Sequence, residues 1–156
     1  MSRAPQYRQL SWDQVSEGDE LPADVDHLDV ERVVATAAST WTFFGGHIDA
    51  DYARSAQGRS HVYMPTGPIL GLLDRYVTSW AGPHAFLAKR SMRMADSLYA
   101  GDELRFEGLV TKKWMDDSRG YNRPLIEIDL KIRNGADKAC VLATASYELP
   151  LTANVS

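Results

Sequence analysis

The chain has 156 residues, of which 44% are apolar and 24% charged, a composition typical of one globular domain and unlike that of a disordered segment. Its 17 basic and 21 acidic residues leave a net charge of −4, which argues against nucleic acid as the main partner. The single cysteine, Cys140, excludes a disulfide framework and a multi-cysteine zinc site. Residues 1–14 lack the apolar core of a secretory signal, and no apolar run reaches the roughly 18 residues of a membrane span. We therefore expect a cytoplasmic protein that does not associate with membranes.

The first third of the chain is expected to form short helices and turns. A polar arm over residues 1–15 leads to a turn at 17–19 and a short extended stretch. Asp29 is a candidate N-cap for a helix with apolar residues at helical spacing, and this helix is expected to fail near residues 41–44. Gly45 and Gly46 then predict a turn. Asp49 is a second candidate N-cap, for a short helix that stops at Gly58.

The clearest helix is predicted over about residues 67–81. Pro68 stands in its first turn, where a helix tolerates proline, and Gly82 followed by Pro83 marks its end. Its apolar residues recur at the i, i+3, i+4, i+7 spacing of one buried face, and they are Ile69, Leu72, Leu73, Tyr76, Val77 and Trp80. Leu70 is apolar as well, so the buried face is wide enough to lie against a sheet.

After residue 85 the apolar residues recur with period two, as they do in strands. A strand is predicted over 103–114, and apolar residues alternate with charged ones over 126–133. Asn134 followed by Gly135 predicts a hairpin that leads into a last strand over 139–149. A long helix followed by about four antiparallel strands predicts an α+β domain in which the sheet wraps around the central helix. This arrangement is a hot-dog fold.

Four segments resemble those of MaoC-like hot-dog hydratases and dehydratases, in the family's order and over nearly the whole chain. They are SWDQVSEGDEL at 11–21, GGHIDADYA at 45–53, PTGPILGLL at 65–73 and MADSLYAGDELRFEGLVTKK at 94–113. A narrower resemblance, carried by AQGRSHVYM at 56–64 and RYVTSWAGP at 75–83, is to small actinobacterial single-hot-dog subunits. Those subunits act on bulky acyl-CoA thioesters, including steroid side-chain intermediates, and several work with a second MaoC-like chain.

The resemblance implies an enoyl-thioester hydratase or dehydratase that needs no cofactor. In (R)-specific enoyl-CoA hydratases, an Asp and a His five residues later hold the water that adds to the double bond. An N–H at the start of the central helix binds the thioester oxygen. Carried over to this chain, the histidine is His47 and the N–H donor lies near Gly67. The substrate implied is an enoyl or 3-hydroxyacyl thioester of coenzyme A or of a carrier.

The acid position departs from the family's pattern. Thr42 stands five residues before His47, where the family has Asp, and Phe44 replaces a residue that is usually polar. Threonine does not ionise at physiological pH, whereas a general acid–base group is worth roughly 10²–10⁴-fold in rate. Three explanations are open: Asp49 or another nearby group substitutes, a partner chain supplies the carboxylate, or the reaction differs.

Several other residues allow both a functional and a structural interpretation. Asp49 fits a helix cap better than a base, whereas His47 fits the site. Tyr63 and Met64 precede the central helix, where they either line the pocket or pack in the core. His27, His61 and His84 lack metal-ligand spacing, so no metal site is expected.

One basic cluster stands out in the second half of the chain. It consists of Lys89, Arg90 and Arg93. These residues either meet the phosphates of coenzyme A or form the solvated face of a strand.

Three functions follow from these patterns. The first is a hydro-lyase centred on His47, the second a non-catalytic subunit that completes a partner's active site, and the third a hot-dog enzyme repurposed for another small molecule. We expect a homodimer, or a heterodimer with a second MaoC-like chain, with the acyl pocket against the partner.

Overall fold

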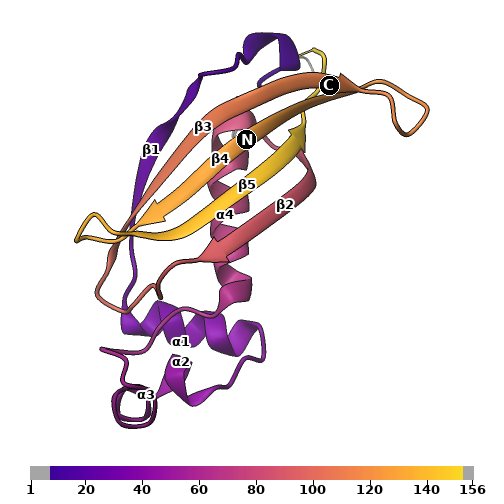
Figure 1. Cartoon of the computed structure of the whole chain (residues 1–156). Helices are drawn as coiled ribbons and strands as arrows, with labels where there is room; N and C mark the ends of the chain where they lie inside the picture. The colour runs from indigo at the N-terminus through magenta and orange to yellow at the C-terminus, as the bar shows by residue number, and fades with distance from the viewer. Residues whose placement is uncertain (1–7, 153–156) are drawn as a thin grey trace, which may run out of the picture.

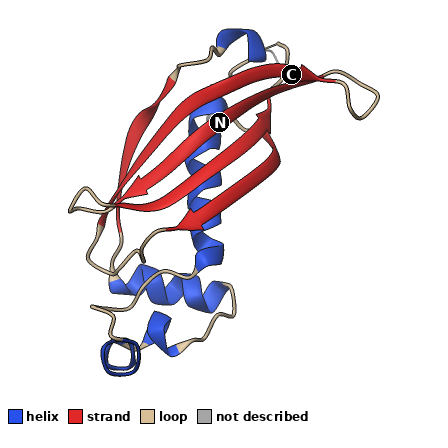
Figure 2. Ribbon diagram, in the orientation of Figure 1, coloured by secondary structure: helices blue, strands red, loops and turns tan. Residues whose placement is uncertain are grey.

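The computed structural model describes residues 8–152, which form one antiparallel sheet and a set of helices (Figure 1). In chain order the elements are a short 3-10 turn Trp12–Gln14, β1 Glu20–His27, α1 Val30–Ser39, α2 Gly45–Ile48, α3 Ala50–Gln57, α4 Thr66–Ala81, β2 Phe86–Met94, β3 Glu103–Asp116, β4 Arg123–Arg133 and β5 Ala139–Glu148. The sheet has the strand order β1-β3-β4-β5-β2 and curves around α4. The helices α1, α2 and α3 lie together beyond the lower end of the sheet (Figure 2). The predicted α+β hot-dog architecture is confirmed.

The central helix α4 supplies the middle of the core. Leu73 and Val77 are fully buried, Pro68 lies in its first turn, and Gly82 ends it with φ +101°. Each fully buried aliphatic side chain of this kind contributes roughly 1.5–3 kcal/mol to folding. Three apolar residues of α4 are only half-buried, namely Leu70, Leu72 and Trp80. The fully buried face of the helix is therefore narrower than the sequence suggests. The predicted helix is confirmed, with its first residue at Thr66.

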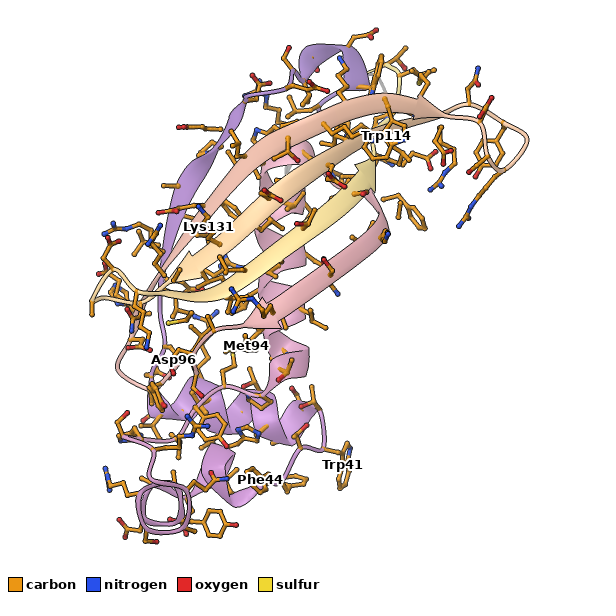
Figure 3. The ribbon with its side chains drawn as sticks, in the orientation of Figure 1. Trp41, Phe44, Met94, Asp96, Trp114 and Lys131 are labelled. Atoms are coloured by element: carbon orange, nitrogen blue, oxygen red, sulfur yellow. The ribbon has the colours of Figure 1, made fainter. Side chains whose placement is uncertain are left out.

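Buried and more exposed side chains alternate along the first half of β3 and the second half of β4. Fully buried side chains on β3 and β4 include Leu104, Phe106, Ile126, Ile128 and Ile132. Lys131, labelled in Figure 3, points away from α4 on the outer face of the sheet. The hairpin predicted at Asn134 is present, but residues 134–138 form its loop and Asp137 adopts the positive φ. Asn134 shapes this loop because its Oδ1 accepts from the N–H groups of Ala136 and Lys138.

The N-terminal segment was predicted to be a polar arm, and this is wrong for the part that the structure describes. Residues 1–7 lie outside the described residues. Leu10 and Val15 are buried, and the Leu10 N–H donates to the Ala81 carbonyl at 2.8 Å. The turn predicted at 17–19 is confirmed, with Gly18 at φ +90°.

The two predicted helix caps are confirmed. Asp29 Oδ1 accepts from the Arg32 N–H at 2.7 Å at the start of α1. Asp49 caps α3, which ends at Gly58 in the left-handed conformation with φ +63°.

The turn predicted at Gly45 and Gly46 is wrong, because these residues begin the helical turn α2. The reason for two glycines here is space. A Cβ on Gly45 would lie 2.4 Å from the Tyr52 ring, and one on Gly46 would lie 2.7 Å from the Tyr63 hydroxyl.

No helix within residues 8–152 is both long enough and apolar enough to cross a membrane.

Candidate active site

His47 lies in α2 with only 8% of its surface exposed. Its Nδ1 is 2.7 Å from the Tyr63 carbonyl oxygen. A carbonyl oxygen can only accept, so Nδ1 carries the hydrogen, and the neutral ring keeps its lone pair on Nε2. The ring also packs edge-on against Phe44 and Tyr63, with centroid distances of 5.6 and 4.8 Å. These contacts hold the imidazole as an oriented base.

A pocket of about 320 Å³ opens beside His47. Its lining comes from α2, the segment before α4, the first residue of α4 and the end of β2 with the loop that follows, and consists of His47, Arg59, Tyr63, Met64, Thr66, Met94, Ala95, Asp96 and Ser97. Met94 and Asp96 lie together where β2 approaches the helical end of the molecule (Figure 3). The pocket therefore joins segments that are up to 50 residues apart in the sequence, from position 47 to position 97.

The start of α4 borders this pocket. Thr66 lines the pocket, Gly67 follows it and is exposed, and Pro65 provides no side-chain cap. The N–H groups of a helix's first turn have no partner within the helix, and the helix dipole favours negative charge there. Pro68 has no N–H to offer. Thr66 and Gly67 are thus the candidate donors to a thioester oxygen.

Thr42, at the family's acid position, and Asp49, the substitute suggested from the sequence, both lie outside the pocket lining. Thr42 Oγ1 is 3.0 Å from Thr40 Oγ1, in the chain that follows α1. Asp49 Oδ1 accepts from the N–H groups of Asp51 and Tyr52 at 2.9 and 3.1 Å, which is a helix cap.

Asp96 is a carboxylate in the pocket that sequence reasoning missed. Its Oδ2 pairs with Lys138 Nζ, and its Oδ1 accepts from the Ser97 N–H at 2.7 Å. The hydrogen bond from Lys138, followed by that from Ser97, lowers the pKa of Asp96 below its ordinary value. Asp96 is therefore a carboxylate at neutral pH. Position 96 belongs to the family-like segment at 94–113, but nothing in its spacing relates it to His47.

Comparison with known proteins identifies the family. No family model matches the chain. Over 79 residues it is 39% identical to the beta subunit of 3-oxo-4,17-pregnadiene-20-carboxyl-CoA hydratase from Mycobacterium tuberculosis; the match covers 51% of this chain and 60% of that subunit's length. A chain in the crystal structure of the ChsH1-ChsH2 complex from the same organism is 31% identical, with a TM-score of 0.75, over 86% of this chain and 98% of that one. This chain belongs to the MaoC-like hot-dog hydratase and dehydratase family.

The same fold occurs in the MaoC-like dehydratase from Rhodospirillum rubrum. The two chains are 17% identical, with a TM-score of 0.77 over 90% of this chain and 96% of that one. This likeness concerns the fold, whereas the 31% identity to the chain of the ChsH1-ChsH2 complex confirms the family resemblance predicted from the sequence.

Three of the predicted binding residues surround His47 in this MaoC-like domain. Tyr63 and Met64 line the pocket, and the Tyr63 hydroxyl donates to Gln57 Oε1 at 3.0 Å. Phe44 contacts the His47 ring but is 42% exposed. Tyr63 thus has two parts in the site, since its carbonyl orients His47 and its ring forms a wall.

Lys89 and Arg90 lie elsewhere on the MaoC-like domain, at a separate cavity between α4 and β2. Arg90 pairs with Asp74 and donates to the Leu70 carbonyl at 3.1 Å. Tyr147 also donates to Asp74, at 2.9 Å. Arg90 therefore ties α4 to the sheet, whereas Lys89 is exposed on β2.

An aromatic patch continues outward from His47. We define it as Trp41, Phe43, Phe44, Ile48 and Tyr52, all at least 41% exposed. Trp41 is 85% exposed and has φ +53°, a left-handed conformation that bulky residues rarely adopt. Figure 3 shows Trp41 and Phe44 at the helical end, away from the sheet. Within residues 8–152, no three His, Cys, Asp or Glu side chains cluster as metal ligands would.

Proposed function

We propose that this chain is a hydro-lyase subunit that adds water to an enoyl thioester, or removes it from the 3-hydroxyacyl thioester, with His47 Nε2 as the base. The observation that carries the proposal is the hydrogen bond from His47 Nδ1 to the Tyr63 carbonyl, at 2.7 Å. It leaves Nε2 with a lone pair beside a pocket that begins at the first turn of α4.

In the forward direction, Nε2 takes a proton from water as the water oxygen bonds to C3 of the substrate. Negative charge then develops on the thioester oxygen, where the N–H groups of Thr66 and Gly67 stabilise it. The imidazolium returns the proton to C2, which completes the 3-hydroxyacyl thioester. One histidine can make both transfers when hydrogen and hydroxyl add to the same face of the double bond.

The substrate we propose is an acyl-CoA thioester, and the assembly a pair with a second MaoC-like chain. The similarity to the hydratase beta subunit and to the ChsH1-ChsH2 complex supports both choices. The aromatic patch supports a large apolar acyl group or partner surface beside His47, because exposed patches of this kind mark binding surfaces.

A second candidate is a subunit without activity of its own that completes the partner's site. Thr42 and Asp49 favour it, since the first does not ionise and the second is occupied as a helix cap. The third possibility, a different reaction on another small molecule, rests on the same departure at Thr42.

The test compares His47→Ala and Thr42→Asp with the wild type on a panel of enoyl-CoA thioesters, with and without the second chain. For the hydro-lyase, His47→Ala removes most of the rate, roughly 10²–10⁴-fold, with an unchanged circular dichroism spectrum. Thr42→Asp changes turnover by no more than a few-fold, because Thr42 lies outside the pocket lining. His84→Ala is the matched control, because His84 is exposed and outside the pocket.

The other outcomes separate the alternatives. If neither substitution changes the rate of the two-chain complex by more than a few-fold, the chain is the non-catalytic subunit. If the wild type hydrates none of the enoyl-CoA thioesters but acts on another small molecule, and His47→Ala abolishes that activity, the reaction differs from hydration. An unchanged rate for His47→Ala in every setting would falsify its catalytic role.

A further inference from the structure

Arg59 places an unpaired positive charge on the pocket that holds His47. It is the only Lys or Arg in the pocket lining. Within residues 8–152, no carboxylate lies within the 4.0 Å of an ion pair with its guanidinium. The chain as a whole is acidic, with a net charge of −4. The positive charge at this pocket is therefore opposite in sign to the net charge of the chain.

The backbone and an aromatic ring hold Arg59 in place. Gly58 adopts φ +63° at the end of α3, and the Arg59 N–H then donates to the Ala53 carbonyl at 2.9 Å. The guanidinium carbon lies 5.8 Å from the centroid of the Tyr63 ring, within the range of a cation–π contact. The Tyr63 carbonyl orients His47, so one residue positions both the base and the cation.

Two neighbouring basic residues, unlike Arg59, form ion pairs with carboxylates. Arg54, on the same helix-and-loop segment, pairs with Asp51 at 3.2 Å and donates to the Ser60 carbonyl. Lys138 approaches the pocket but pairs with Asp96, which offsets the charge of that carboxylate. The charge of Arg59 also contributes to the lowered pKa of Asp96, but the ion-pair partner of that carboxylate is Lys138. The Arg59 guanidinium, at more than ion-pair distance from Asp96, remains available to an anion.

We propose that Arg59 binds a phosphate of the group that carries the acyl thioester. A guanidinium offers a planar pair of donors that matches a phosphate, and a charge-assisted bond of this kind is about twice as strong as a neutral one. His47, which is more than nine-tenths buried and lines the same pocket, marks where the thioester end would lie. The proposal rests on the function proposed above and moves phosphate recognition from the cluster of Lys89, Arg90 and Arg93 to the His47 pocket.

The phosphate has two possible sources, which share the phosphopantetheine arm. One is coenzyme A, with its diphosphate and ribose phosphate, and the other is the arm of an acyl carrier protein, with a single phosphodiester. Binding is measured by titration calorimetry of the full chain with coenzyme A, 4′-phosphopantetheine and pantetheine, which has no phosphate. The chain carries His47→Ala throughout, so that binding is read without turnover.

In this background, Arg59→Gln is expected to weaken coenzyme A binding about tenfold and leave pantetheine binding unchanged. Arg54→Gln is the matched control and should leave both unchanged. The loss should shrink as salt is raised, because added ions screen an exposed charge pair. A matching loss for 4′-phosphopantetheine assigns the contact to the arm's phosphate, and a loss for coenzyme A alone assigns it to the nucleotide phosphates.

The proposal is overturned if Arg59→Gln binds coenzyme A as tightly as its parent, or if the parent does not bind coenzyme A at all. It is also overturned if Arg54→Gln loses as much coenzyme A affinity as Arg59→Gln, or if Arg59→Gln loses as much affinity for pantetheine as for coenzyme A. Hydration of an enoyl-pantetheine thioester, which offers no phosphate to Arg59, remains a separate measure of the hydro-lyase function. The two experiments can therefore give different answers. The phosphate contact can be refuted while the hydro-lyase function is supported, and the function can be refuted while the contact is supported.

Discussion

Leu73→Ala tests how α4 is built into the core. Leu73 is fully buried in the middle of a helix whose first residue, Thr66, lines the pocket. The substitution removes three buried carbon groups at about 0.8 kcal/mol each, and the cavity that remains adds to this loss. We expect the free energy of unfolding to fall by about 2–5 kcal/mol.

The loss is measured by urea unfolding followed by far-ultraviolet circular dichroism, at one protein concentration because assembly would otherwise shift the midpoint. Leu70→Ala is the control, since Leu70 lies on the same helix but is only half-buried, and it should lose clearly less. A loss under about 1 kcal/mol for Leu73→Ala, or an equal loss for the two variants, would show that the buried face of α4 is assigned wrongly.

Two smaller changes examine charged groups. Asp49→Ala should lower the free energy of unfolding in urea by about 1 kcal/mol, because it removes the cap of α3. Turnover should fall less than tenfold. A collapse of the rate in a folded variant would instead make Asp49 the missing acid. Arg32→Ala should destabilise the chain at pH 6, because the hydrogen bond from Arg32 lowers the pKa of Asp26 from its ordinary 3.8. Since the folded pKa is the lower one, this stabilisation is present above pH 3.8 and is lost as the pH falls through the folded value. The gap between variant and wild type should therefore close in acid, and a gap that stays constant with pH would contradict the linkage.

The features that could be predicted from sequence depend on local signals. Asp29 and Asp49 were recognisable as caps because an acidic side chain before an apolar helical pattern satisfies that helix's own first N–H groups. The period of α4 and the alternation of the strands likewise report which face is buried. Gly45 and Gly46 were misread because the reason for them is tertiary: the rings of Tyr52 and Tyr63 occupy the space that a Cβ would need.

The site could be predicted only in part, for the same reason. His47 was identified through a family motif, and Tyr63 and Met64 through their position before α4. Asp96 and Arg59 reach the pocket because the end of β2 and the loop after α3 meet there, a long-range arrangement that no spacing in the chain encodes.

Trp41 makes the aromatic patch observable with light. An indole as exposed as this one emits at the long-wavelength limit of tryptophan fluorescence, and it is one of only four in the chain. Trp12 is partly buried and donates its indole N–H to the Leu125 carbonyl, so it reports on the sheet instead. An acyl chain or a partner subunit that covers the patch would therefore shift the emission of Trp41 toward the blue, and Trp41→Phe would remove that signal. Trp41, the most exposed large apolar side chain within residues 8–152, is thus also a built-in reporter of what binds at the patch.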